Sequence, residues 1–265
     1  MGSGATVLDA REKESFNQGH IPAAQPVDWR TWRDGITRVG RLQVDLEGIA
    51  HDLSVLGVQD DAPVLVYGAG SGGWGEEGRI FWMLEYLGHA DAHILDGGWA
   101  AWDQAGLPAS THQASSAQGD FQAHPKEELR TRLEEMERVV ESCLADGPPP
   151  TTCKTVIWDT REKREFDGAT PYLEHQGGHI PSATHLWFGD LFAADGTLLS
   201  ATALQHKLSK QNITPDKHVV ALCTGGVRSG MAYAVLRSLG YQHVTNYDGS
   251  MWEWTESTDR AMTPQ

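Results

Sequence analysis

Residues 219–236 read VVALCTGGVRSGMAYAVL. An apolar strand ends on Cys223, a glycine-bearing loop closes on Arg228, and a helical pattern follows at once. The amides of such a loop can turn inward and the helix presents its positive end, so an anion is favoured at the cysteine. A helix N-terminus and an adjacent arginine also lower the pKa of a thiol, so we predict a reactive thiolate at Cys223. The alternative, a small buried hydrophobe that ends a strand, leaves the glycines and the arginine unexplained.

The 265 residues include 40% hydrophobic and 22% charged side chains, as in a folded soluble protein. No apolar run approaches the roughly 20 residues of a membrane helix, and residues 1–4 lack the basic and apolar segments of a signal peptide. These first residues look like a cloning remnant ahead of a strand at residues 6–9. We therefore predict a cytoplasmic protein, or a periplasmic one if an N-terminal signal has been removed.

The formal charge of −15 at pH 7 argues against nucleic acid and acidic membrane surfaces as partners. An anionic substrate would need local cations and amides that overcome this field. The three cysteines cannot form a disulfide framework and none lies in a CxxC pair, so we expect no structural zinc. Cys143 and Cys153 could bridge in an oxidising compartment, but we interpret both as incidental.

The two halves of the chain repeat each other over about 150 residues, the size of a duplicated domain. Five blocks recur in the same order, which does not arise by chance. They pair VLDARE (7–12) with VIWDTRE (156–162), GHIPAA (19–24) with GHIPSA (178–183), VLVY (64–67) with VVAL (219–222), LG (87–88) with LG (239–240), and LDGGW (95–99) with YDGSM (247–251).

Each half alternates short apolar strands with periodic helical segments such as residues 79–87. This alternation predicts an α/β fold in which each half forms a mostly parallel sheet with helices on both faces. Ligands of such sheets bind beyond the C-terminal ends of the strands, where the Cys223 loop begins.

The boundary between the halves follows from composition. We predict a first domain at residues 5–112, a polar linker at residues 113–125, and a second domain at residues 126–265. An amphipathic helix opens the second domain, with its apolar positions at Leu129, Leu133, Met136, Val139 and Val140.

The copies differ where the chemistry is expected. The second has Cys223 after its strand, whereas the first has Gly68 and a longer loop at residues 70–75 without a cysteine. We therefore predict that the second domain is catalytic and that the first supports it. Trp74 in the first loop lies at the equivalent strand end, so it either reaches a shared interdomain cleft or packs the interface.

These features together resemble the tandem-domain rhodaneses, a family of thiosulfate and 3-mercaptopyruvate sulfurtransferases. The resemblance covers nearly the whole chain and is carried by the Cys223 loop, the two His-Ile-Pro turns, and residues 244–254, VTNYDGSMWEW. The chain departs from the family pattern in two places. The usual Pro-Gly-Ala is Pro-Ala-Ala at 22–24 and Pro-Ser-Ala at 181–183, and Met251 replaces an aromatic residue.

The resemblance implies a ping-pong mechanism without a cofactor. The thiolate attacks the outer sulfur of a donor such as thiosulfate, becomes a persulfide, and passes that sulfur to cyanide in assay or to a thiol in cells. Loop amides would stabilise the persulfide, and Arg228 would add positive charge toward the donor, unless it only pairs with a neighbouring carboxylate. The candidate substrate-binding residues beside catalytic Cys223 are Thr224, Gly225, Gly226, Val227, Arg228, Trp74 and Arg164.

Residues repeated in both copies are better explained by the fold. We expect the two Asp-x-Arg pairs to bond at strand ends and the two histidines to satisfy loop backbone groups, with a catalytic base as the alternative for His179. Trp252 and Trp254, which follow a strand end near the Cys223 loop, either wall the pocket or pack in the core. The repeated residues are Asp9, Arg11, Asp159, Arg161, His20 and His179.

The sulfur donor is left open by the loop. In the family, thiosulfate enzymes of the animal type carry Arg-Lys-Gly-Val-Thr after the cysteine and mercaptopyruvate enzymes carry Gly-Ser-Gly-Val-Thr, whereas residues 224–228 are Thr-Gly-Gly-Val-Arg. A family arginine is replaced by Glu165, with Arg164 beside it. In the family, the mercaptopyruvate type has a longer insert before the first His-Ile-Pro, whereas the segment at residues 16–19 is short. The resemblance therefore makes mercaptopyruvate the less favoured donor. Thiosulfate and protein or low-molecular-weight persulfides remain.

Two other classes of function are alternatives to sulfur transfer. Cysteine phosphatases and arsenate reductases on a related fold use a Cys-x5-Arg loop, but only four residues separate Cys223 from Arg228, which suits sulfur better than phosphate. A non-enzymatic persulfide carrier or interaction module is the other alternative. We expect a small anionic donor and a thiol or cyanide acceptor as partners; the oligomeric state is not predicted.

Overall fold

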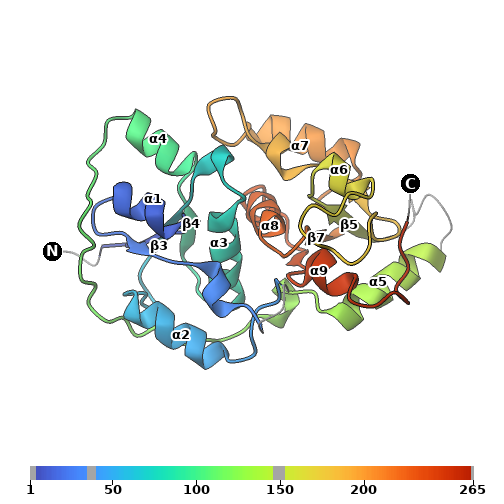
Figure 1. Cartoon of the computed structure of the whole chain (residues 1–265), viewed down its shortest axis with the longest axis horizontal. Coiled ribbons are helices and arrows are strands. Elements are labelled where there is room, and N and C mark those ends of the chain that lie inside the picture. The colour runs from blue at the N-terminus through green and yellow to red at the C-terminus, as the bar shows by residue number, and fades with distance from the viewer. Residues whose placement is uncertain (1–3, 35–39, 146–152, 264–265) are drawn as a thin grey trace.

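The computed structural model describes residues 4–34, 40–145 and 153–263. It forms two α/β units, each built on a four-stranded parallel sheet, in the strand orders β2-β1-β3-β4 and β6-β5-β7-β8 (Figure 1). Helices cover both faces of the sheets, so the predicted fold class is confirmed. The first four residues are only partly described, because residues 1–3 lie outside these ranges.

The elements of the two units follow the same order along the chain. The first unit contains β1 (Thr6–Asp9), α1 (Lys13–Gln18), β2 (Gln25–Pro26), η1 (Trp29–Trp32), α2 (Leu46–Val55), β3 (Val64–Tyr67), η2 (Gly70–Gly72), α3 (Glu76–Tyr86), β4 (Ala92–Ile94) and α4 (Gly98–Gln104). The second contains η3 (Glu127–Leu129), α5 (Leu133–Ala145), β5 (Thr155–Asp159), α6 (Lys163–Phe166), β6 (Thr184–His185), η4 (Phe188–Leu191), α7 (Ala201–Lys210), β7 (His218–Leu222), α8 (Arg228–Ser238), β8 (Val244–Asn246) and α9 (Ser250–Trp254).

Strand β7 is apolar along its whole inner length because both of its faces are covered. It lies between β5 and β8, and Val219 through Leu222 have no exposed surface. A strand with helices on both sides needs a continuous apolar run rather than an alternating one. The run VVAL therefore places the end of β7, and Cys223 after it, in the interior.

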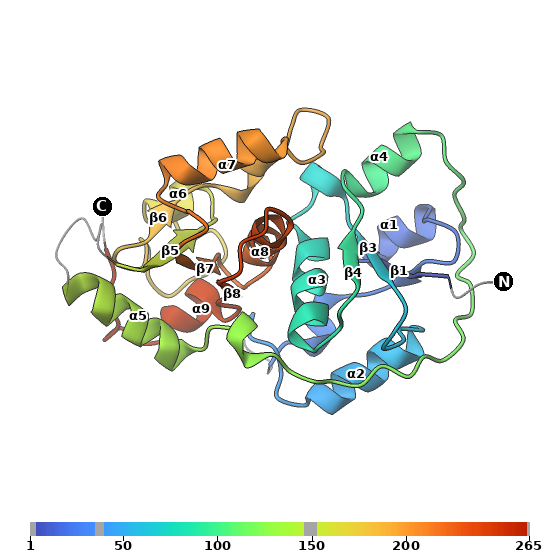
Figure 2. The same ribbon diagram turned by 180° about the vertical axis from the view of Figure 1, so that it is seen from behind.

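Helices α3 and α8 lie side by side where the two units meet (Figures 1 and 2). Glycines allow their backbones to approach: a Cβ atom on Gly78 would overlap the backbone of Met231, and one on Gly230 would lie 2.8 Å from the Cα of Arg79. Buried side chains of both units join one hydrophobic cluster, which includes Ile80 and Val235. The first unit thus packs directly on the helix that follows the cysteine loop.

The segment predicted as a linker runs along the outside of the first unit (Figure 2). Gly119 N donates a hydrogen bond to Ser54 O at 2.8 Å, and His124 N donates to Leu87 O at 2.7 Å. Phe121 is buried against this unit. The amphipathic helix expected after it is α5, which buries Met136 and Val140; Leu129 lies just before it, in η3.

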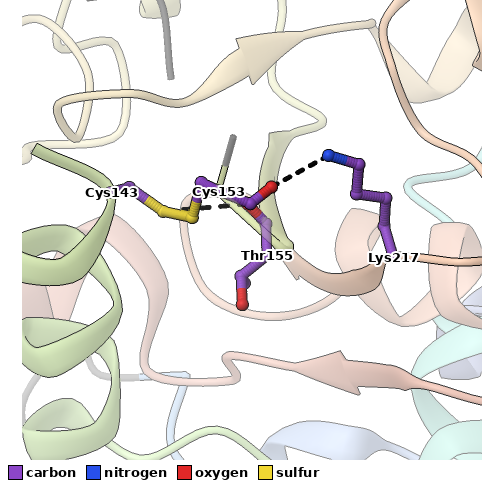
Figure 3. The surroundings of a disulfide bond; sticks show 4 residues. All are labelled: Cys143, Cys153, Thr155 and Lys217. Atoms are coloured by element: carbon purple, nitrogen blue, oxygen red, sulfur yellow. Dashed lines mark hydrogen bonds between the residues drawn. A yellow bond between two sulfur atoms is a disulfide. The ribbon is translucent and has the colours of Figure 1, made fainter. Parts of the chain in front are cut away.

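Cys143 and Cys153 form a disulfide, so our interpretation of them as incidental was wrong (Figure 3). Helix α5 returns to the start of β5, which brings the two Cα atoms to 5.3 Å, within the range that a disulfide spans. Lys217 Nζ donates to the carbonyl of Cys153 at 2.9 Å. The proline-rich residues between the cysteines fall in 146–152, outside the described residues.

Among the described residues, no helix has both the length and the apolar character that crossing a bilayer requires.

Candidate active site

Cys223 directly follows β7, and hydrogen bonds of its own backbone groups fix its position. Its N–H donates to Ser250 Oγ at 3.1 Å, and its carbonyl accepts from Met251 N at 3.1 Å. The side chain is 1% exposed. Gly226 N–H points at the sulfur with an N···Sγ distance of 3.1 Å, and Ser229 Oγ lies 3.7 Å from the same atom. The thiol therefore faces hydrogen-bond donors, as the strand, loop and helix pattern predicted.

The pKa of the Cys223 thiol is lowered. Burial raises it, but the charge of Arg228 and hydrogen bonds from Ser229 and the Gly225 backbone outweigh burial. Each of these groups stabilises the thiolate more than the neutral thiol. The loop thus favours the nucleophilic form of sulfur without a metal.

Two glycines of the loop are required by its geometry. A Cβ atom on Gly225 would overlap the ring of Trp252. Gly226 has a φ of +80°, and a Cβ atom there would lie 2.5 Å from Arg79 Nη1 and 2.6 Å from the carbonyl oxygen of Asp248. Glycine tolerates both constraints, so the loop can close tightly around the sulfur.

Arg228 is bound to a buried carboxylate. Its Nη1 and Nη2 donate to the two Glu165 oxygens at 2.6 and 2.8 Å, and Nη2 also donates to Thr224 Oγ1 at 2.6 Å. Thr224 Oγ1 in turn donates to Glu165 at 2.8 Å. This is the carboxylate pairing that we weighed as the alternative role for Arg228. The guanidinium still acts on the thiolate through its charge, but its hydrogen-bond donors are largely occupied.

Glu165 is a site residue that sequence reasoning missed. It is fully buried. Burial raises its pKa, but Arg228 and Thr224 outweigh burial, so the pKa lies below its ordinary value. The signal was present in the sequence, because Glu165 occupies the position of a family arginine and Arg228 closes the loop.

A pocket of about 220 Å³ opens above Cys223 and is lined by both units. Trp74 of the first unit stands edge-on to Tyr172 of the second with ring centroids 5.6 Å apart, and the Arg228 guanidinium lies 5.2 Å from the Trp74 centroid. Of the predicted residues, the pocket brings together Cys223, Thr224, Gly225, Val227, Arg228 and Trp74. Further lining residues are Trp29, Arg30, Arg33, Glu76, Tyr172 and Trp252.

Arg164 is placed outside this pocket. Its side chain is 59% exposed and its Nε donates to Glu162 at 2.6 Å. The pocket instead receives Arg30 and Arg33 from the first unit, which sequence reasoning did not single out. Arg30 is paired with Glu12 and Asp28, whereas Arg33 forms no ion pair with any residue in the described ranges.

The repeated residues form hydrogen bonds at strand ends and loops, as predicted. Arg161 donates to Asp159 at 2.7 Å and to Gly178 O at 2.8 Å, and Arg11 bonds Asp9 and Gly19 in the same way. His20 and His179 each place Nδ1 near a phenylalanine carbonyl, at 2.9 and 3.0 Å. Trp252 lines the pocket and Trp254 is buried in the core.

The first unit has a carboxyl group where the second has its cysteine. Gly68 corresponds to Cys223, and Glu77, in the place of Ser229, would overlap a Cβ atom on Gly68. Glu77 is 2% exposed, and burial raises its pKa to about 8. The space for a sulfur is thus filled, which explains physically why this copy lacks the thiolate site.

No group of three or more histidine, cysteine or acidic side chains is placed to hold a metal ion in the described part of the chain.

Known proteins resemble this chain over most of its length. The family model of the rhodanese-like domain matches residues 1–105 and 149–257. The chain is 30% identical to a thiosulfate sulfurtransferase of Azotobacter vinelandii, over 96% of this chain and 89% of that protein. It is 31% identical to the sulfur carrier protein TtuD of Thermus thermophilus, over 90% and 83%.

Solved structures share the fold. The wild-type structure of EanB superposes with a TM-score of 0.84 at 20% identity, covering 98% of this chain and 64% of EanB. A persulfide form of an EanB variant with ergothioneine gives 0.86 at 19% identity, covering 100% and 66%. The two parallel sheets, the matches to the family model and to the relatives, and the cysteine loop agree with one another. The chain therefore belongs to the rhodanese family of sulfurtransferases.

Proposed function

We propose that the protein moves a sulfane sulfur from thiosulfate or a related donor to a thiophilic acceptor through a Cys223 persulfide. One observation carries the proposal: a buried thiol of lowered pKa, 3.1 Å from Gly226 N, at the base of a 220 Å³ pocket. Relatives named thiosulfate sulfurtransferase support the thiosulfate type over the 3-mercaptopyruvate type.

The steps balance without a cofactor. The Cys223 thiolate attacks the outer sulfur of thiosulfate, the S–S bond of the donor breaks, and sulfite leaves with the bonding electron pair. The acceptor then attacks the terminal sulfur of the persulfide, and the Cys223 thiolate leaves. Gly226 N–H and the neighbouring loop amides, with Thr224 and Val227 on either side, stabilise the sulfur anion in both steps.

A cationic side chain of the first unit would bind the negatively charged sulfonate of the donor. Arg228 lines the pocket but is paired with Glu165, whereas Arg33 lines it without an ion pair among the described residues. We propose that Arg33 contacts the sulfonate and that Trp74 shields the sulfur from water. Arg164, directed toward Glu162, has no part in this proposal.

A persulfide carrier is the second candidate, because one relative is named a sulfur carrier protein. A carrier forms the same persulfide but turns over slowly with small acceptors. Phosphatase or arsenate reductase activity is disfavoured, since a tetrahedral oxyanion needs a free guanidinium at the loop and Arg228 is paired with Glu165.

We also propose a compartment from the disulfide. Structural disulfides persist in oxidising environments. The Cys143–Cys153 disulfide therefore supports the periplasmic alternative over the predicted cytoplasmic location.

Turnover of thiosulfate and cyanide, measured as thiocyanate formation, tests the proposal. We expect catalytic turnover that depends on Cys223. Stoichiometric labelling of Cys223 without turnover would favour the carrier, and neither labelling nor turnover with thiosulfate or low-molecular-weight persulfides would refute sulfur transfer.

A further inference from the structure

Arg79 is a buried cation of the first unit that contacts the cysteine loop of the second. It lies near the start of α3, has no exposed surface, and packs over the Trp82 ring at 4.8 Å. Its Nη2 donates to Gly40 O at 2.7 Å and its Nη1 donates to Gly226 O at 3.4 Å. A guanidinium thus connects the non-catalytic unit to the loop around the thiolate.

Gly226 presents its two peptide groups to different partners. Its N–H donates to Cys223 Sγ at 3.1 Å, while its carbonyl accepts from Arg79 and from Asn246 Nδ2, the latter at 3.1 Å. A glycine with a φ of +80° has few steric restraints of its own, so outside contacts determine its orientation. Arg79 supplies one of these contacts from the first unit.

The charge of Arg79 acts on the same loop. Burial lowers its pKa to about 10, so it stays protonated at neutral pH, and its charge and the Cys223 thiolate attract each other. The nearest carboxylate, Asp248, lies 3.8 Å away and is shared with Arg130 at 3.0 Å and with Leu42 N at 2.6 Å. Two guanidinium groups and one carboxylate leave a net positive charge beside the loop.

The stability of the fold alone does not explain an arginine at position 79. Its Nε has no hydrogen-bond partner among the described residues, and the equivalent position of α8 holds Met231. Removing Arg79 would still leave Asp248 paired with Arg130 at 3.0 Å, so the ion pair with Asp248 does not by itself require Arg79. The contact with the loop accounts for an arginine where the other copy has a methionine.

We propose that Arg79 is a positioning residue that orients the Gly226 N–H toward Cys223 and stabilises the thiolate from across the domain interface. The thiolate part of this inference holds for any chemistry of Cys223, whereas its effect on sulfur transfer rests on the proposed function.

The test measures the rate of Cys223 alkylation by iodoacetamide as a function of pH, since the other two cysteines are bonded to each other. For Arg79→Met and Arg79→Gln we expect profiles displaced to higher pH, with alkylation about tenfold slower at pH 6, because loss of a nearby cation raises a thiol pKa. Because Asp248 keeps Arg130 as a partner, Arg79→Met should still fold, and reactivity is compared at a temperature below its thermal midpoint. Arg79→Lys should regain most of the reactivity.

Arg237→Met is the matched control. Arg237 is an interface cation 3.3 Å from Glu85 and has no contact with the cysteine loop, so its profile should equal that of the wild type. Wild-type profiles in both neutral Arg79 variants would overturn the inference, and Arg79→Gln decides if Arg79→Met does not fold. A displaced profile in a protein that forms no persulfide would refute the proposed function and leave the role of Arg79 intact.

Discussion

Replacing Glu165 by glutamine removes the carboxylate that neutralises Arg228 and changes the shape of the site very little. In the native site both Glu165 oxygens accept from Arg228, at 2.6 and 2.8 Å, and one also accepts from Thr224 at 2.8 Å. Glutamine keeps one acceptor oxygen and replaces the other by a donor that faces the guanidinium. Arg228 then remains buried as a charge without its counter-ion.

Losing one partner of a buried ion pair costs about 3–5 kcal/mol. We expect the lower end, about 3 kcal/mol, because the Cys223 thiolate also attracts Arg228 and offsets part of the loss. For a chain of this size, 1 kcal/mol shifts the thermal midpoint by about 2–4 °C, which predicts a decrease of roughly 6–12 °C.

The loss should depend on pH with a defined sign. The pKa of Glu165 is lower in the folded protein than its ordinary value. The carboxylate therefore stabilises the fold above its unfolded pKa, and this contribution disappears as the pH falls through the folded pKa. The difference between wild type and Glu165→Gln should accordingly be largest at pH 7 and shrink in acid.

Sulfur transfer should improve in Glu165→Gln, although the stability of the fold decreases. Without Glu165, the charge of Arg228 acts undiminished on the thiolate and on the donor, so we expect a lower Cys223 pKa and a lower KM for thiosulfate. The assays are thiocyanate formation and thermal unfolding from pH 7 down to a pH below the ordinary pKa of a glutamate. Asp167→Asn, which removes an exposed pair with Lys163, is the control and should change stability by less than about 1 kcal/mol. An unchanged midpoint together with unchanged thiosulfate kinetics in Glu165→Gln would refute the reasoning.

Three further predictions concern donor binding, the loop and the disulfide. Arg33→Gln should raise the KM for thiosulfate about tenfold with little change in kcat, as for lost ground-state binding, while Arg164→Gln should match the wild type; equal KM values would exclude Arg33 as the donor contact. Gly226→Ala should slow sulfur transfer at least about 100-fold by displacing a donor to the sulfur, and near-normal rates would show that this amide is dispensable. Reducing the disulfide should cost about 2–3 kcal/mol of stability, measured by unfolding with and without reductant; an unchanged midpoint would count against the bond.

The fold was predictable because the apolar strand runs and the repeated blocks indicate the same two-domain arrangement. The apolar runs at 64–67 and 219–222 are the central strands, and the repeated Asp-x-Arg and His-Ile-Pro blocks form the same contacts in both units. Cys223 could be identified because its surroundings are local: the strand end, the glycines and the helix start all lie within one short stretch.

What the sequence did not predict depends on contacts between distant segments. Glu165 and Arg228 are 63 positions apart and Arg79 and Gly226 are 147 apart, so no local pattern joins them. Arg164 lies beside the position of the family arginine in the sequence, but the short helix α6 turns Glu165 inward and leaves Arg164 at the surface. The disulfide likewise required knowing that α5 returns to β5.

The central claim, that Cys223 carries the sulfur, is tested most directly by intact and peptide mass spectrometry after a single addition of thiosulfate, with released sulfite measured in parallel. We expect one added sulfur atom on the peptide that contains Cys223, one sulfite per added sulfur, and loss of the added mass when cyanide is supplied. We also expect no added sulfur in Cys223→Ser, which should keep its fold because this position only ends a strand. Sulfur transfer retained by Cys223→Ser, or sulfite release without sulfur on Cys223, would show that Cys223 does not carry the sulfur.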